Sequence, residues 1–121
     1  MIIAVKRIYS APEAADGVRI LVDRLWPRGL KKATANIDAW AKDIAPSTEL
    51  RQWYGHDPKK WDEFRRRYFA ELEANAALLD QLREQMGEGP VTFLYSSKEN
   101  ELNNAMALRE YLERPATQPP N

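Results

Sequence analysis

Segment 23–29, Asp-Arg-Leu-Trp-Pro-Arg-Gly, holds the residues of this chain that are best equipped for chemistry. It follows the apolar, β-branched run 18–22, which predicts a strand, so the segment falls in the loop at that strand's carboxyl end. In α/β proteins such loops hold ligands. Arg24 and Arg28 can each bind a carboxylate or phosphate through paired hydrogen bonds. We therefore predict an anion site here, with Trp26 either stacked on a planar ligand or covering the end of the sheet.

The charged residues of this loop also have a structural interpretation. The two arginines would then form internal ion pairs that hold the loop, and the candidate carboxylates are Asp23, Asp43 and Glu71. Asp23 is our candidate catalytic residue, because a carboxylate whose pKa is raised can act as a general base or bind a metal. Its alternative role is that of a counter-ion to Arg24 and Arg28. The sequence leaves both alternatives open.

A second polar segment follows the run 91–95, which also predicts a strand. If this strand lies parallel and next to the strand 18–22, both loops open at the same edge of the sheet. Ser96, Ser97 and Lys98 would then add hydrogen-bond donors to the anion site, and a serine beside a lysine can serve as a nucleophile. Either Asn103 or Asn104 would point back into the same crevice from the last helix, where asparagine is a poor helix former. The alternative is a solvated turn.

His56 is the single histidine of the chain. Its neighbour Asp57 would orient the imidazole and raise its pKa, which is typical of an acid/base pair. Asp57 also fits the N-cap of the helix that Pro58 begins. The role of His56 therefore stays open at this point.

The composition sets limits on partners. The 121 residues hold 18 basic and 18 acidic side chains, so the chain lacks the bulk charge that favours nucleic acid or a membrane surface. There is no cysteine, and one histidine with carboxylates in no metal-binding spacing predicts no metal site and no cofactor. With no signal segment and no long apolar run, we expect a cytoplasmic protein. The oligomeric state is left open.

The elements that position these residues follow from periodicity and turn residues. We expect strands at 2–8, 18–25 and 91–95, a further strand within 33–44, a helix from Ser47 to about Tyr54, a helix from Pro58 to Met86 with a kink near Asn75, and a last helix capped by Asn100. The strand at 2–8 is expected to be buried on both faces. Glu71 is expected to support the arginine loop and, if it is buried, to pair with an arginine. This order predicts a small three-layer α/β domain, residues 1–113, with a mostly parallel sheet flanked by helices and a flexible tail at 114–121.

The chain resembles the DUF488 family of the YeaO-like type. The stretches that carry the resemblance are Val22-Asp-Arg-Leu-Trp-Pro-Arg-Gly29, Trp40-Ala-Lys-Asp-Ile-Ala-Pro-Ser47, Leu50-Arg-Gln-Trp-Tyr-Gly-His-Asp57, Trp61 with Phe64, Tyr68, Glu71 and Leu72, Val91-Thr-Phe-Leu-Tyr95, and Asn104-Ala105 with Leu108. The resemblance implies an α/β fold and favours a role for Asn104. It implies no established activity.

Two hypotheses for the function follow. The first is an enzyme or binder of a small anionic metabolite that carries a phosphate or a carboxylate, for example a nucleotide. Its site would consist of Asp23, Arg24, Trp26, Arg28, Ser96, Lys98 and Asn104. It requires these side chains to share one pocket. The second is a non-catalytic module for a protein or a nucleic acid, which requires exposed aromatic residues on one continuous surface. The balanced charge disfavours nucleic acid.

Overall fold

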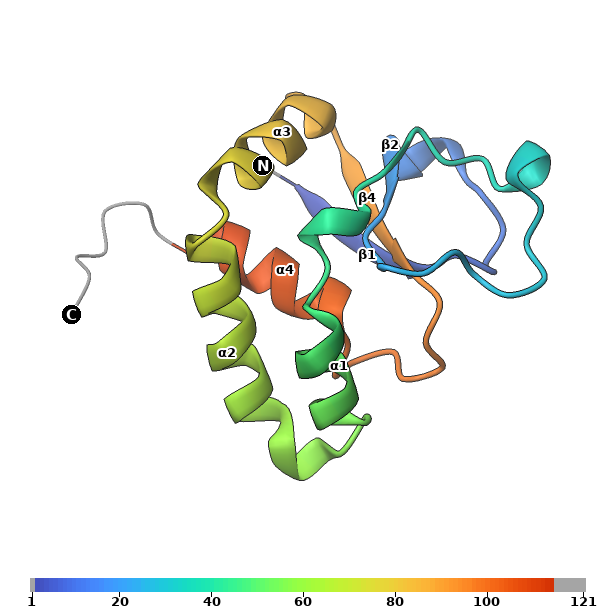
Figure 1. The fold of residues 1–121 in the computed structure, drawn as a ribbon. Helices are drawn as coiled ribbons and strands as arrows, with labels where there is room; N and C mark the ends of the chain where they lie inside the picture. Colours follow the sequence, from blue (N-terminus) through green and yellow to red (C-terminus); the bar gives the residue numbers. More distant parts are fainter. Residues whose placement is uncertain (1, 115–121) are drawn as a thin grey trace.

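A four-stranded, all-parallel sheet forms the centre of the molecule, as a computed structural model that describes residues 2–114 shows (Figure 1). The strands are β1 (Ile3–Arg7), β2 (Val18–Leu21), β3 (Ala39–Trp40) and β4 (Val91–Tyr95), in the order β1-β4-β2-β3. The helices are α1 (Thr48–Tyr54), α2 (Trp61–Glu73), α3 (Ala76–Met86) and α4 (Asn104–Glu113). The predicted α/β fold is confirmed. The predicted tail, 114–121, lies outside the described residues apart from Arg114.

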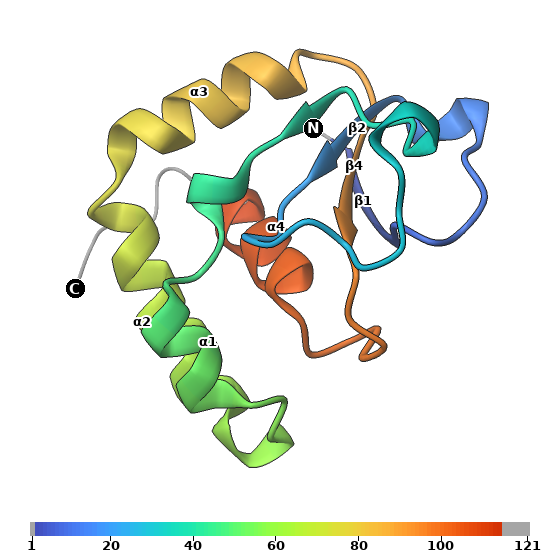
Figure 2. The same ribbon diagram turned by 45° about the vertical axis from the view of Figure 1, so that its right-hand side comes forward.

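The two faces of the sheet have different covers. Figures 1 and 2 show the four α-helices gathered on one face, where Ile20 and Phe93 belong to the main core. Leu21 and Leu94 alternate with those residues and point to the other face. That face is covered by the segment between β2 and β3, chiefly by Trp26 and by Trp40 of β3. The third layer is therefore a loop with one short 3₁₀ turn, Lys32–Thr34.

Several predicted boundaries are corrected. The strand expected at 2–8 is the edge strand β1 and is mostly half-buried, because it pairs with β4 alone. β2 ends at Leu21, before the Asp-Arg-Leu-Trp segment. The expected single helix from Pro58 begins as a 3₁₀ turn and breaks at 74–75 into α2 and α3. The cap of α4 is Asn103, whose side chain accepts a hydrogen bond from the Met106 amide, instead of Asn100.

The segment after β3 follows the sequence prediction closely. Ser47 caps α1 by accepting a hydrogen bond from the Leu50 amide at 3.1 Å. Gly55 ends the helix in the left-handed conformation. Asp57 accepts a hydrogen bond from the Lys59 amide at 3.0 Å, as predicted for a cap. None of the helices within the described part of the chain combines the length and the apolarity needed to cross a membrane.

A buried charge cluster holds the amino-terminal ends of the central strands. Asp16 forms ion pairs with Arg19 of β2 and with Lys6 of β1, and both Asp16 and Arg19 are buried. The backbone oxygen of Asp16 accepts a hydrogen bond from the Thr92 hydroxyl of β4 at 2.8 Å. Burial by itself would raise the pKa of the Asp16 carboxyl, but the Glu13 amide together with Lys6 and Arg19 lowers it below its ordinary value of 3.8.

This cluster predicts an acid-sensitive contribution to stability. Because the pKa of Asp16 is lower in the folded chain than in the unfolded chain, the contribution is complete above pH 3.8 and is lost as the pH falls through the folded-state value. Asp16→Asn should therefore be strongly destabilised at neutral pH, where the charge of Arg19 stays buried without its partner. The gap to the wild type should narrow below pH 3.8. Urea unfolding from pH 7 to pH 3 measures it, and a constant gap would contradict the assignment.

Candidate anion-binding pocket

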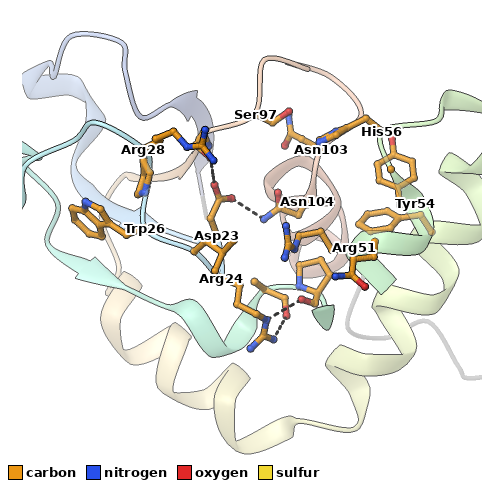
Figure 3. A pocket seen from close by; sticks show the side chains of 18 residues that line it. Asp23, Arg24, Trp26, Arg28, Arg51, Tyr54, His56, Ser97, Asn103 and Asn104 are labelled. Carbon is orange, nitrogen blue, oxygen red and sulfur yellow. Dashed lines mark hydrogen bonds between the residues drawn. The ribbon is translucent and has the colours of Figure 1, made fainter. Parts of the chain in front are cut away.

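A pocket of about 430 Å³ opens at the carboxyl ends of β2 and β4 (Figure 3). β2 and β4 are parallel neighbours, as the sequence analysis required for the two polar loops to meet. The walls come from the loop after β2, from α1 and the turn that follows it, and from the loop before α4. Six of the seven predicted site residues line this pocket, namely Asp23, Arg24, Trp26, Arg28, Ser96 and Asn104. Lys98 is exposed and does not line it.

Asp23 ties the elements around the pocket together. One carboxylate oxygen accepts hydrogen bonds from the Ser96 amide at 2.9 Å and from the Ser96 hydroxyl at 2.7 Å. The other accepts a hydrogen bond from the Asn104 amide group at 3.2 Å. The Asn104 side chain also donates to the Val22 carbonyl at 3.0 Å. The carboxylate thus joins the end of β2, the end of β4 and the first turn of α4.

Arg24 and Glu71 fix the neighbouring wall without pairing with each other. The Arg24 guanidinium donates to the carbonyls of Ala45 at 3.0 Å and Pro46 at 3.2 Å. The Glu71 carboxylate accepts from the Ser47 amide at 2.8 Å and from the Ser47 hydroxyl at 2.6 Å. Glu71 is half-buried, and its partner is Ser47 instead of the arginine expected for a buried carboxylate. Both side chains hold the segment 45–47 that leads into α1.

Arg28 and Arg51 are the two arginines of the pocket whose side chains have no partner among residues 2–114. Both are exposed, and within residues 2–114 neither side chain forms a hydrogen bond or an ion pair. Figure 3 shows Arg28 at one side of the pocket and Arg51 at the other, with Asp23 and Asn104 drawn between them. The internal ion pair considered for Arg28 does not form among the described residues. Arg51 was missed because one arginine in a short polar helix has no distinctive spacing.

Trp26 contributes both to the pocket and to the packing of the sheet. Its indole N–H donates to the Leu30 carbonyl at 2.6 Å, and its ring contacts the Trp40 ring edge-on at a centroid distance of 5.3 Å. The ring is half-buried, as are the other tryptophans of the chain. The aromatic residues proposed for a protein-binding surface are Trp26, Trp53 and Tyr54, of which the first two are half-buried and Tyr54 is buried, so none of the three is exposed.

His56 lies at the rim of the pocket in a left-handed conformation, with φ at 58°. Its ring is 6.0 Å from that of Tyr54, and its side chain is exposed. Asp57, the partner considered for it, is used in capping the Lys59 amide. The amides of Glu101 and Leu102, with a smaller contribution from the charge of His56, hold the pKa of the Glu99 carboxyl below its ordinary value.

The fold and the pocket define a small α/β protein with a ligand-sized cavity at the carboxyl ends of two parallel strands. A model of the DUF488-N3i family, described as the inactive DUF488-N3 subclade, matches residues 2–119. The chain belongs to this family, which confirms the resemblance seen in the sequence.

The relatives of this chain are similar along nearly their whole length. Escherichia coli K12 YeaO, described as an uncharacterized protein, is 43% identical over 112 residues, which cover 93% of this chain and 97% of YeaO. The uncharacterized protein Rv3073c of Mycobacterium tuberculosis H37Rv is 41% identical over 110 residues, which cover 91% of this chain and 92% of the relative. No solved structure matches this chain.

Proposed function

We propose that this protein binds a small anionic metabolite in the pocket and holds it between Arg28 and Arg51. The observation that carries the proposal is the pair of guanidinium groups that face one pocket with no carboxylate partner among residues 2–114. An arginine that is not used in an internal ion pair keeps its paired donors for a carboxylate or a phosphate.

The charge and the size of the pocket support the same ligand class. Three arginines and one aspartate line it, so the lining carries an excess of positive charge. Arg24 adds to this field although its donors are taken up by carbonyls. The volume, about 430 Å³, lies in the range of pockets for single small molecules and not of grooves for polymers.

Binding without turnover is the version that we favour. Asp23, the candidate catalytic residue, has both carboxylate oxygens engaged by hydrogen-bond donors of the protein, so the carboxylate serves to hold Ser96 and Asn104 in place. We propose that Asp23 positions the loop and Asn104. The family description, which calls the subclade inactive, supports this choice.

A thermal-shift screen with the wild type, Arg28→Ala and Arg51→Ala tests the proposal. The probes are inorganic phosphate, sulfate, sugar phosphates, nucleoside monophosphates and small carboxylic acids. A probe at about one hundred times its Kd should stabilise the fold by about 2.7 kcal/mol, which raises the midpoint by several degrees. The shift should be seen with the wild type and lost with both variants.

Two control variants separate a specific site from a general charge effect. Arg28→Lys keeps the charge but loses the paired donors, so it should bind more weakly than the wild type. Arg83→Ala removes an exposed arginine of α3 that does not line the pocket, and should bind as the wild type does. A shift that survives in Arg28→Ala and Arg51→Ala, or no shift with any probe, would contradict the proposal.

A further inference from the structure

The orientation of the Asn104 side chain is fixed by its neighbours. Its amide nitrogen donates to the Val22 carbonyl at 3.0 Å and to an Asp23 carboxylate oxygen at 3.2 Å. Figure 3 shows the bond to Asp23 as a dashed line. A flipped side chain would place the amide oxygen against two acceptors, which repel it. The nitrogen therefore faces Val22 and Asp23, and the oxygen faces away from them.

The Asn104 amide oxygen is left as an acceptor at the pocket. Within the described residues no N–H or O–H donates to it, while both hydrogens of the amide nitrogen have acceptors. Asn104 is half-buried and lines the pocket. Asn103, the neighbouring asparagine, is different, because its oxygen accepts from the Met106 amide and its nitrogen donates to the Glu99 carbonyl. Of the two, Asn104 is the one with a free acceptor.

We propose that the Asn104 oxygen accepts a hydrogen bond from a hydroxyl group of the ligand, so that the pocket selects hydroxylated anions such as sugar phosphates or hydroxy acids. This inference rests on the proposed function, because Arg28 and Arg51 hold the anionic group. An ammonium group would be repelled by the three arginines of the lining, so the donor is neutral. Asp23 takes part indirectly: it holds the Asn104 nitrogen and thereby aims the oxygen.

The selectivity follows from the cost of an unused acceptor. A site built to bind a hydroxyl group discriminates strongly against an analogue that lacks it, because the buried polar group then stays unpaired. Asn104 is only half-buried, so water reduces the discrimination. We expect at least about tenfold weaker binding of the deoxy analogue, which corresponds to the loss of one hydrogen bond and lies far below the discrimination of a fully buried site.

Matched ligand pairs test the inference by calorimetry with the full chain. The pairs are glycerol 3-phosphate with n-propyl phosphate, lactate with propionate, and adenosine monophosphate with its 2′,3′-dideoxy analogue. In the wild type, the hydroxylated member of at least one pair should bind at least about tenfold more tightly than its partner. In Asn104→Ala the ratio of the two Kd values should fall toward one. Asn100→Ala, which changes an exposed asparagine outside the pocket, should keep the ratio of the wild type.

The outcomes separate this inference from the proposed function. Equal binding of both members of every pair by the wild type would overturn the inference and leave the anion site standing. A ratio that persists in Asn104→Ala would place the selectivity at another residue and also overturn it. If Asn104→Ala does not fold, the wild-type ratios decide. No binding of any probe would overturn both proposals together.

Discussion

The Gly17→Ala variant is expected to lose about 3 kcal/mol of stability or more, because the position has neither the backbone freedom nor the space for a side chain. The φ and ψ angles of Gly17 are 65° and −138°, a combination that is essentially restricted to glycine. A Cβ atom at this position would lie 2.1 Å from the Pro90 carbonyl oxygen. That oxygen accepts the hydrogen bond from the Val18 amide, at 3.0 Å, that starts the pairing of β2 with β4. Denaturant unfolding followed by circular dichroism measures the loss.

Gly29→Ala is the matched control for Gly17→Ala. Gly29 also has a positive φ, 78°, but nothing lies within 4 Å of the position of its Cβ. Its substitution should therefore cost only the conformational strain, about 1–2 kcal/mol. If the two variants were equally stable, the close approach to Pro90 would not be the cause.

The second large effect is expected from Asp23→Ala, which should cost about 2–4 kcal/mol. Without the carboxylate, the amide and hydroxyl of Ser96 and one N–H of Asn104 lose their acceptor. These groups are half-buried, so water replaces only part of the lost interaction. Since the carboxylate joins β2, β4 and α4, the loss should appear in global unfolding and not only in the loop. Urea unfolding at neutral pH gives the free energy.

Asp43→Ala provides the comparison for this variant. Asp43 is exposed and has no hydrogen bond or ion pair from its side chain within residues 2–114. Its removal should change stability by no more than about 0.5 kcal/mol, as is usual for surface positions. An equally small effect of Asp23→Ala would show that the three hydrogen bonds to Asp23 contribute little.

The parts of the fold that could be predicted from the sequence are those with local signals. The apolar runs at 18–22 and 91–95 predicted β2 and β4, and Ser47 and Gly55 predicted the two ends of α1. Each of these features depends on residues only a few positions apart. The boundary near Asn75 was visible as a kink. The last helix was misplaced at its start, because Asn100 and Asn103 are equally good caps and only packing decides between them.

The parts of the site that could not be predicted depend on contacts between distant segments. The two alternatives for Arg24 were a bound anion and an internal carboxylate, but its guanidinium bonds to the carbonyls of Ala45 and Pro46, and every residue has such an acceptor. The Ser47 amide is likewise a backbone group of a common kind, so the sequence could not show that Glu71 would accept a hydrogen bond from it. Arg51 joins the pocket only because α1 and the loop after β2, which are distant in the sequence, line the same cavity. The sequence showed which polar side chains lie at the ends of the strands, but not the groups to which these side chains bind.

The order of the strands has a consequence for the folding of this protein during its synthesis on the ribosome. β4 lies between β1 and β2, although it is the last strand to be synthesised. A nascent chain that has not reached residue 95 can pair β2 only with the two-residue β3, and β1 has no neighbour. The apolar residues of β1 and β2 therefore lack their central neighbour until the carboxyl-terminal quarter of the chain has been synthesised. Folding then has to be a late, concerted event in which the sheet and the pocket form together.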